Sequence, residues 1–290
     1  TLYNPNHFFG FFSAFNSDAI KDVELIKGGF PAEYGGRLSA VLNVTNKDGD
    51  LYKTNGKVTL GLISSRGTIE TPIGDGALTL SGRRTYIVII LDAVGLTKSL
   101  ELPDYHFYDL NGKFTQNLGQ NDKIAVSGYG GTDVLSFTNG KQASSVDISW
   151  GNQSGAANWT HLFANDLFMK VNATGSHYFS LLKFGIGDNS FSFDNQIFDY
   201  TLHGDLEYFL GSEHEIKTGF QLSQYEFILN IKQATNPPNA DLDLKPIYYA
   251  GYISDQWKPT EQLAITTGLR IDGISSRKDI GIDPRITVRY

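Results

Sequence analysis

The stretch that decides the fold is residues 200–210, which read YTLHGDLEYFL. Apolar or small side chains occupy the even positions, and polar or charged ones occupy positions 201, 203, 205 and 207. Successive side chains of a strand point to opposite faces, so this two-residue period predicts a strand with one apolar and one polar face. The same alternation runs through residues 263–272 and through most of the chain after residue 55. The sequence therefore predicts an all-β protein built of consecutive antiparallel hairpins.

Composition excludes several classes of protein and site. The 290 residues contain no Cys, which excludes a disulfide scaffold, a thiolate zinc site and a cysteine nucleophile. The 24 Lys and Arg residues are scattered and are outnumbered by 31 Asp and Glu residues, so nucleic acid is not an expected partner. The six His residues form no pair with metal-ligand spacing. We expect no cofactor, no metal, no catalytic residue and no enzymatic activity.

The connections between the predicted strands differ in length at their two ends. Short turns are expected at residues 119–122, 164–166, 211–213 and 259–262, and longer loops at 91–103, 135–143, 185–193 and 232–245. This asymmetry is typical of outer-membrane barrels, and each segment exceeds the roughly 9 to 11 residues that cross a bilayer. Six aromatic residues toward segment ends fit either an interfacial girdle or an ordinary core: Tyr108, Trp150, Trp159, Tyr200, Tyr208 and Trp257.

The first fifty residues lack the long alternating segments found in the rest of the chain. A short helical turn is expected at residues 16–21, followed by strands near residues 23–27 and 41–44. Between these strands lies a segment of four Gly and one Pro in ten positions, residues 28–37, which we name the knot. Such a composition requires unusual backbone angles. No phosphate-binding glycine spacing is present, so a structural role is expected for these glycines.

The knot carries a family resemblance. Residues 18–45, with the segment KGGFPAEYGGRLSAVLNV at positions 27–44, resemble the end of the plug domain of TonB-dependent outer-membrane transporters, most closely the Bacteroidetes type. Residues 6–16, 82–86 and 283–290 are similar to further parts of that family. The resemblance implies a plugged barrel of 22 strands, a size known for such transporters.

On this resemblance, residues 1–50 are the C-terminal part of the plug and residues 51–290 are the N-terminal half of the transmembrane β-barrel, with about twelve strands. Because an open sheet leaves unpaired edges in lipid, we expect the chain to be a fragment of a longer one. In the knot, Arg37 and Glu33 are candidates to pair with charges of the barrel lumen and hold the plug, although a solvated turn explains them equally well. The remaining members of the motif are Gly28, Gly29, Pro31, Tyr34, Gly35 and Gly36.

The function that the resemblance implies is TonB-dependent uptake of a metal chelate, a vitamin, an oligosaccharide or a peptide across the bacterial outer membrane. The implied partners are TonB, through a segment missing from this chain, an extracellular ligand, outer-membrane lipid and a surface lipoprotein. Loop-borne candidates for ligand contact are Tyr105, Phe107, Phe191 and Phe193, with loop self-packing as the competing explanation. Two alternatives remain open: a soluble all-β carbohydrate-binding module, and an outer-membrane adhesion or secretion component on the same fold.

Overall fold

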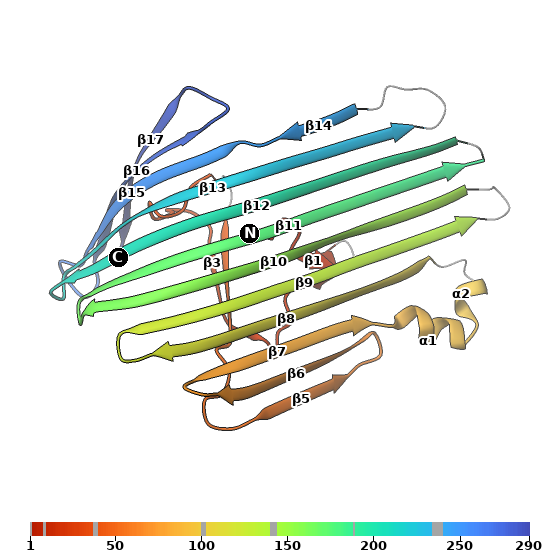
Figure 1. Ribbon diagram of the computed structural model, residues 1–290, viewed down its shortest axis with the longest axis horizontal. Helices are drawn as coiled ribbons and strands as arrows, with labels where there is room; N and C mark the ends of the chain where they lie inside the picture. The colour runs from red at the N-terminus through yellow and green to blue at the C-terminus, as the bar shows by residue number, and fades with distance from the viewer. Residues whose placement is uncertain are drawn as a thin grey trace.

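The computed structural model describes residues 2–7, 10–36, 40–99, 103–139, 144–187, 189–233 and 240–290. Most of these residues belong to one antiparallel sheet of thirteen strands, which we name the wall (Figure 1). Its strands are β5 (Asn55–Leu60), β6 (Ser64–Ile73), β7 (Gly76–Thr85), β8 (Asp104–Leu118), β9 (Asp122–Asn139), β10 (Ser144–Ala164), β11 (Leu167–Ile186), β12 (Asn189–Leu210), β13 (His214–Gln233), β14 (Ala240–Leu244), β15 (Ile247–Trp257), β16 (Ala264–Ile274) and β17 (Ile280–Arg289).

The order of the strands across the wall follows the chain, so each strand pairs with its sequence neighbours. The exception is β13, which pairs with β15 over residues 214–224 and with β14 over residues 227–231. Lys245 and Pro246 separate β14 from β15, because proline has no N–H to donate to the ladder. The predicted number of about twelve strands therefore corresponds to twelve positions along the wall, with β14 as the thirteenth strand.

The two faces of the wall have opposite polarity. In β8 the buried positions include Asp109, Asn111 and Thr115, whereas Tyr108 and Leu110 are 49% and 61% exposed. The predicted two-residue alternation is therefore confirmed, with polar side chains toward the concave face. Large apolar side chains cover the convex face, as expected for strands whose outer side meets lipid.

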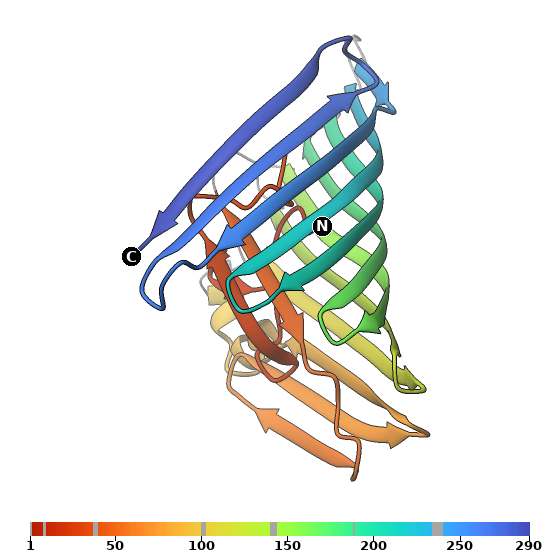
Figure 2. The same cartoon turned by 90° about the vertical axis from the view of Figure 1, so that its left-hand side faces the viewer.

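The described residues among 2–50 (2–7, 10–36 and 40–50), which we name the inner segment, lie on the concave face of the wall (Figure 2). They contain two small antiparallel sheets. The first pairs β1 (Asn6–His7) with β2 (Phe12–Ser13), and the second pairs β3 (Ile20–Ile26) with β4 (Val41–Asn46). The knot joins β3 to β4 and lies near β16 and β17, far along the wall from β1.

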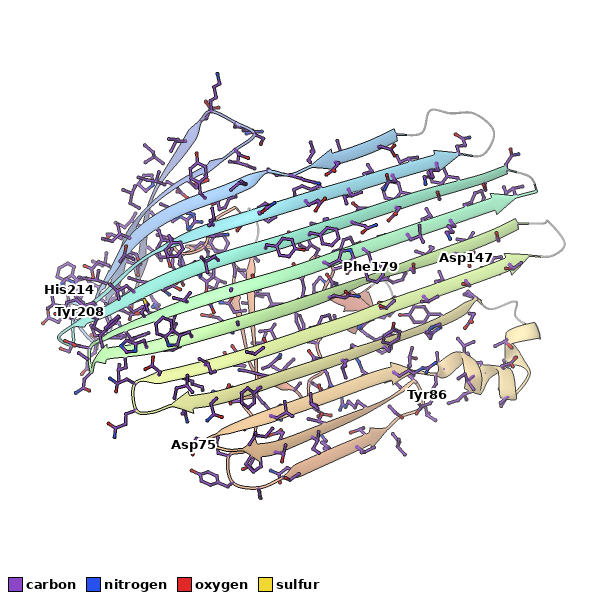
Figure 3. All side chains as sticks on the ribbon, viewed as in Figure 1. Asp75, Tyr86, Asp147, Phe179, Tyr208 and His214 are labelled. Carbon is purple, nitrogen blue, oxygen red and sulfur yellow. The ribbon has the colours of Figure 1, made fainter. Side chains whose placement is uncertain are left out.

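The long connections were predicted too long. No long loop covers residues 185–193, because β11 continues to Ile186 and β12 begins at Asn189. Strands also extend into 135–143 and 232–245, and residues 91–103 contain the end of α1 (Ile87–Ala93) and α2 (Leu96–Ser99). Polar side chains in strands that continue beyond a bilayer look like loops in sequence, which explains the error. Turns do lie at one end of the wall, near Tyr208 and His214, opposite the end near Asp147 (Figure 3).

One local prediction was wrong. No helical segment runs through residues 16–21: residues 16–19 form a single turn, in which the Ala19 N–H donates to the Asn16 carbonyl oxygen at 3.0 Å and the Asp18 N–H to Asn16 Oδ1 at 3.1 Å, and β3 begins at Ile20. Of the two explanations left open for Trp150, the structure supports an ordinary core residue, because Trp150 is buried on the concave side against Tyr105 and Phe107. Within the described part of the chain, no helix has the length and apolar character needed to span a membrane.

The neighbours Asn172 and Ala173 of β11 test the assignment of the two faces. Asn172 lies on the concave side, and Ala173 is exposed on the convex side. We expect Ala173→Arg to lower the free energy of unfolding of the protein in lipid vesicles by about 2–4 kcal/mol, because it places a charge in hydrocarbon. Asn172→Arg is the control and should change it by less than about 1 kcal/mol. Urea titration of the protein in phosphatidylcholine vesicles measures both, and equal losses would contradict the assignment.

Candidate functional site

The interface between the inner segment and the wall is the candidate functional site. A hollow of about 1530 Å³ lies along it and is lined by both parts of the chain. Its lining combines hydroxyl, amide and charged side chains with apolar ones such as Leu2, Phe15 and Val41. Around this hollow the inner segment is attached to the wall at separate polar contacts, described below from the knot to the N-terminal end.

The backbone of the knot is held by Arg285 of β17. Its Nη1 donates to three carbonyl oxygens of the knot, those of Phe30 at 3.1 Å, Pro31 at 2.6 Å and Tyr34 at 2.6 Å. Its Nε and Nη2 donate to Asp283 Oδ2 at 2.9 and 2.6 Å, which fixes the plane of the guanidinium. One arginine thus satisfies several acceptors of an irregular turn, a task that suits its planar fork of donors.

A second arginine, Arg270 of β16, holds the middle of the knot. Its side chain is fully buried, and its Nη1 donates to the carbonyl oxygens of Ala32 at 3.0 Å and Glu33 at 3.1 Å. Its Nη2 donates to Gln221 Oε1 and to the Tyr248 hydroxyl, each at 3.0 Å. A buried charge needs hydrogen-bond partners, and here the four bonds from Nη1 and Nη2 join the knot to two strands of the wall. Within the described part of the chain, the buried Nε has no hydrogen-bond partner.

The carboxylate of Glu33 forms an ion pair with Lys217 of β13. Lys217 also lies 3.3 Å from Glu207 of β12, and Glu207 lies 3.1 Å from Lys170 of β11. Glu33 is therefore the inner-segment member of a row of alternating charges that crosses three strands of the wall. Arg37, the other predicted locking residue, lies outside the described residues.

Steric constraints explain why two positions of the knot, 29 and 35, are occupied by glycine. Gly29 adopts φ +62°, a conformation that side-chain-bearing residues rarely take. Gly35 lies so close to Arg270 that an added Cβ would overlap Nε, Cζ and Nη2 of the guanidinium. The absence of a side chain at position 35 therefore lets the buried arginine approach the knot.

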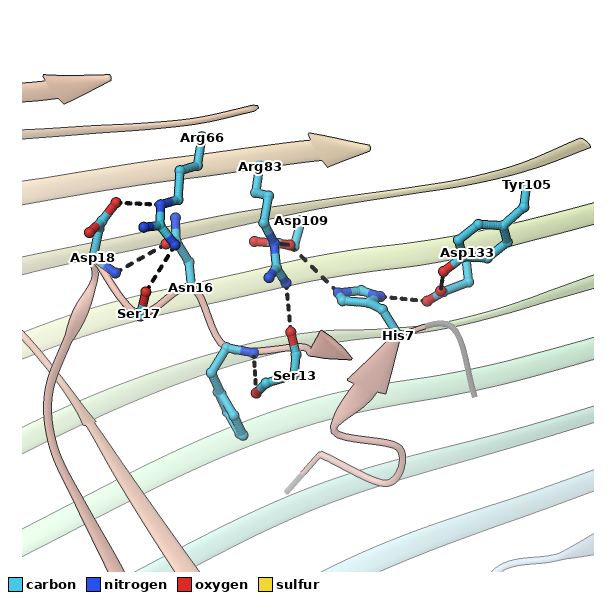
Figure 4. Close-up of polar contacts among 11 residues, drawn as sticks. His7, Ser13, Asn16, Ser17, Asp18, Arg66, Arg83, Tyr105, Asp109 and Asp133 are labelled. Atoms are coloured by element: carbon cyan, nitrogen blue, oxygen red, sulfur yellow. Dashed lines mark hydrogen bonds and ion pairs between the residues drawn. The ribbon is translucent and has the colours of Figure 1, made fainter. Parts of the chain in front are cut away.

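Farther along the wall, at β8 and β9, His7 of β1 inserts between two buried carboxylates (Figure 4). Its Nδ1 lies 2.5 Å from Asp133 Oδ2, and its Nε2 lies 3.5 Å from Asp109 Oδ2. Arg83 donates from Nε to Asp109 at 2.6 Å and from Nη2 to the carbonyl of Ser13 at 2.7 Å. Burial acts to lower the pKa of His7, but its hydrogen bonds and charge attraction to Asp109 and Asp133 outweigh it and raise that pKa.

An aromatic cluster packs beside His7. Its ring stacks on Phe107 with centroids 4.2 Å apart, and the Arg83 guanidinium lies 5.0 Å from the centroid of the same ring. Tyr105 donates its hydroxyl to Asp133 Oδ1 at 2.5 Å. Trp150 completes the buried cluster, against which Phe12 of the inner segment and Val88 of α1 pack.

Two aspartates attach the parts of the inner segment near the turn at residues 16–19 and after β4. Asp18 lies 2.7 Å from Lys57 Nζ and 2.8 Å from Arg66 Nε, and the hydrogen bond from Lys57 is the main cause of its lowered pKa. Asp48 lies 2.6 Å from Lys113 and 3.0 Å from Lys123. The inner segment thus contacts the wall through ion pairs at several points along its length.

The sequence-predicted site residues divide into two groups. In the knot, residues 29–35, which include Glu33, contact the wall. An added Cβ at Gly28 or Gly36 would meet no atom within 4 Å. Tyr105 and Phe107 do not lie in a loop: they are buried in β8, facing the inner segment. Phe191 and Phe193 also lie in a strand, β12, opposite Phe184 and Leu182 of β11. Their expected loop positions were wrong, and contact with a ligand stays a prediction for all four.

Sequence reasoning missed the wall partners Arg270, Arg285, Lys217, Asp109 and Asp133. Their only signal is a charge on the polar face of an alternating strand, which many residues share. Among the described residues, no group of three or more His, Asp or Glu side chains is placed to hold a metal ion. The arrangement supports reversible attachment of one chain segment to another.

The fold and this interface define an antiparallel β-wall of barrel type with a segment attached to its inner face. Residues 93–290 match the family described as "TonB dependent receptor-like, beta-barrel". This match covers more than half of the chain, so the chain belongs to the TonB-dependent receptor family, whose members lie in the bacterial outer membrane. No curated protein matches the sequence.

Solved structures share the fold at low sequence identity. The chain is similar to the outer membrane transporter YddB from Escherichia coli, with a TM-score of 0.69, 11% identity, and coverage of 98% of this chain and 47% of that one. It is also similar to the siderophore receptor PirA from Pseudomonas aeruginosa, with a TM-score of 0.64, 14% identity, and coverage of 93% of this chain and 46% of that one. For the copper transporter OprC the TM-score is 0.67 and the identity 10%, with coverage of 96% of this chain and 48% of that one. The chain spans about half the length of these structures.

A pair of glycine substitutions tests the packing of the knot. We expect Gly35→Ala to weaken the attachment of the knot by about 1–3 kcal/mol, because the new methyl group must displace Arg270. Gly28→Ala is the matched control, because a Cβ there meets no atom within 4 Å. Hydrogen exchange of a peptide covering residues 27–36 measures both, and similar exchange in the two variants would contradict the role of Gly35.

The raised pKa of His7 predicts that the attachment of β1 depends on pH. The stabilisation is complete below the ordinary His pKa of about 6.5 and is lost as the pH rises through the raised pKa, because neutral His7 gives up its charge pairing with Asp109 and Asp133. Arg83 and Tyr105 face the same carboxylates and remain in place. Hydrogen exchange of residues 2–7, corrected for its intrinsic pH dependence, should accelerate on alkalinisation. His7→Gln should abolish this pH dependence of exchange. An unchanged pH dependence in the variant would refute the role of His7.

Proposed function

We propose that this chain is part of a transporter that takes up a nutrient across the outer membrane under the control of TonB. In this proposal residues 1–50 are the C-terminal part of the plug and residues 51–290 are the N-terminal half of the barrel. Membership in the TonB-dependent receptor family supports it, as does the likeness to structures described as transporters and receptors. The protein would act as a transporter and not as an enzyme.

The observation that carries the proposal is the polar attachment of the knot. Arg270 and Arg285 hold it through five backbone carbonyls, and Glu33 adds an ion pair with Lys217. Contacts of this kind next to a hollow of about 1530 Å³ can be replaced by contacts with water when the knot leaves the wall. An apolar interface of the same size would expose hydrophobic surface on separation.

The knot thereby acts as a lock between plug and barrel in the proposed mechanism. Force from TonB would separate the knot from β13, β16 and β17 and enlarge the hollow for the ligand. Each ion pair in a wet interface contributes modestly, so they can be broken in sequence. Arg37 belongs to this proposed lock by its position in the motif.

The class of nutrient remains open among metal chelates, vitamins, oligosaccharides and peptides. Similar structures are described as a siderophore receptor, a ferric-catecholate import receptor and a copper transporter, and one is a complex with pyocin S2. Outer-membrane lipid against the convex face and a surface lipoprotein are further proposed partners. The Bacteroidetes type stays a prediction.

The family assignment bears differently on the two alternative functions. A soluble carbohydrate-binding module is excluded, because the chain belongs to a family of outer-membrane receptors. An adhesion or secretion component on the same fold predicts that the plug need not move. The experiment below separates this second alternative from uptake.

A disulfide between Gly29 and Thr287 tests whether the knot must move. A Cβ at Gly29 would lie 3.8 Å from that of Thr287, the mean separation in disulfides, and the chain has no other Cys. We expect Gly29→Cys with Thr287→Cys to abolish uptake when oxidised and to recover it after dithiothreitol. The measurement is accumulation of four probes in cells that lack the native gene: ferric enterobactin, cyanocobalamin, maltoheptaose and a decapeptide.

The single variants are the controls, since each carries the same substitution without the crosslink. They also correct for the strain of a cysteine at the positive φ of position 29. Uptake of none of the probes by the unsubstituted protein, uptake in cells that lack TonB, or full uptake in the oxidised double variant would each contradict the proposal.

A further inference from the structure

A continuous chain of hydrogen bonds crosses the wall beneath the inner segment and touches that segment at both ends. At one end the Tyr3 hydroxyl donates to Asp199 Oδ2 at 3.1 Å. At the other end Arg270 donates to the carbonyls of Ala32 and Glu33 in the knot. These two contacts join parts of the inner segment about thirty residues apart to the same row of wall side chains.

Three polar side chains connect the two ends. Thr201 Oγ1 donates to Asp199 Oδ1 at 2.7 Å and lies 2.8 Å from Ser223 Oγ. Gln221 Nε2 donates to Ser223 Oγ at 3.0 Å, and its Oε1 accepts from Arg270 Nη2 at 3.0 Å. Thr201 and Ser223 are register partners of β12 and β13, so the ladder itself places their hydroxyls side by side.

The chain has one direction. The single hydroxyl proton of Thr201 goes to Asp199, so Ser223 must donate to Thr201, and Gln221 donates in turn to Ser223. Every donor therefore points from the cation of Arg270 toward the anion of Asp199. Aligned hydrogen bonds between opposite charges polarise one another, so the loss of one bond weakens its neighbours.

Burial limits replacement by water at Asp199, Ser223 and Arg270, whereas Thr201 and Gln221 are half-buried and line the hollow. Ser223 and Arg270 are fully buried, and Asp199 is 2% exposed. When Tyr3 leaves, Asp199 loses one of its donors in a site where water has little access. The remaining bonds must then rearrange toward Asp199, and the orientation that Gln221 gives to the Arg270 fork changes with them.

We propose that this chain of Asp199, Thr201, Ser223 and Gln221 couples the two attachments, so that release of Tyr3 weakens the hold of Arg270 on the knot. Coupling is reciprocal, so release of the knot also weakens the attachment of Tyr3. The use of this coupling in opening the plug rests on the proposed function. The coupling itself is a property of the interface and is measured without any transported ligand.

The test is a double-substitution experiment on the purified protein in detergent. Tyr3→Phe removes only the hydroxyl that donates to Asp199, and exchange is then followed in a peptide covering residues 27–36. We expect exchange in the knot to accelerate about fivefold, the lower end of typical couplings between sites. In a Ser223→Ala background, where the row of hydrogen bonds is interrupted at its middle, Tyr3→Phe should change hydrogen exchange in the knot by less than about twofold.

Two further variants keep the test decisive if Ser223→Ala fails to fold. Thr201→Val removes the hydroxyl and interrupts the row of hydrogen bonds, so it should abolish the effect of Tyr3→Phe. Thr201→Ser retains the hydroxyl and should preserve that effect. Thr115→Val removes a comparable hydrogen bond, from Thr115 Oγ1 to the Asp48 carbonyl, that lies outside the chain, and it should leave knot exchange unchanged.

Equal acceleration by Tyr3→Phe in the intact and cut backgrounds, or no acceleration in the intact background, would overturn the coupling. Either result leaves the proposed uptake untouched, because that proposal is tested by the disulfide between positions 29 and 287. If the disulfide experiment contradicts uptake while the exchange experiment shows the coupling, the proposed uptake is refuted and the coupling stands as a property of the interface.

Discussion

The alternation of side chains along each strand is the constraint on which the rest of the structure depends. A strand with lipid on one side and water on the other must be apolar at every second residue, and its backbone groups must pair within the sheet. The wall meets both demands through long antiparallel ladders. The same alternation fills its concave face with hydroxyl, amide and charged groups, such as Thr201, Asp205 and Glu207 of β12.

A polar concave face determines how a second segment can be held there. Among the described residues, the aromatic cluster around Phe107 is a hydrophobic anchor of the inner segment. Its polar attachments include arginines on carbonyl oxygens and ion pairs, at the knot, at His7, at Asp18 and at Asp48, together with the hydrogen bond from Tyr3 to Asp199. Such contacts are directional and hold one register, yet each one separates without exposing apolar surface.

Much of this could be predicted from the sequence, and the failures have physical reasons. The clean alternation of β12 and β16 predicted the strands and their faces, and the knot was recognised by its glycines. The loops were predicted poorly, because a strand that continues beyond the bilayer carries polar residues on both faces. Tyr105 and Phe107 were also placed in a loop, although β8 begins at Asp104 and directs both rings into the interface, because large aromatic side chains are not expected on the polar face of such a strand.

The sequence by itself determined the period of the strands, the polarity of each face and the identity of the knot, because these depend on neighbouring residues along one chain. Only the tertiary structure decided which wall residues meet the knot. Arg270 and Arg285 lie more than 230 residues from it in sequence, and nothing local distinguishes them from other charges on the polar face. Their partners follow from the strand register across β13 to β17 and from the close approach that Gly35 permits, and both are properties of the assembled sheet.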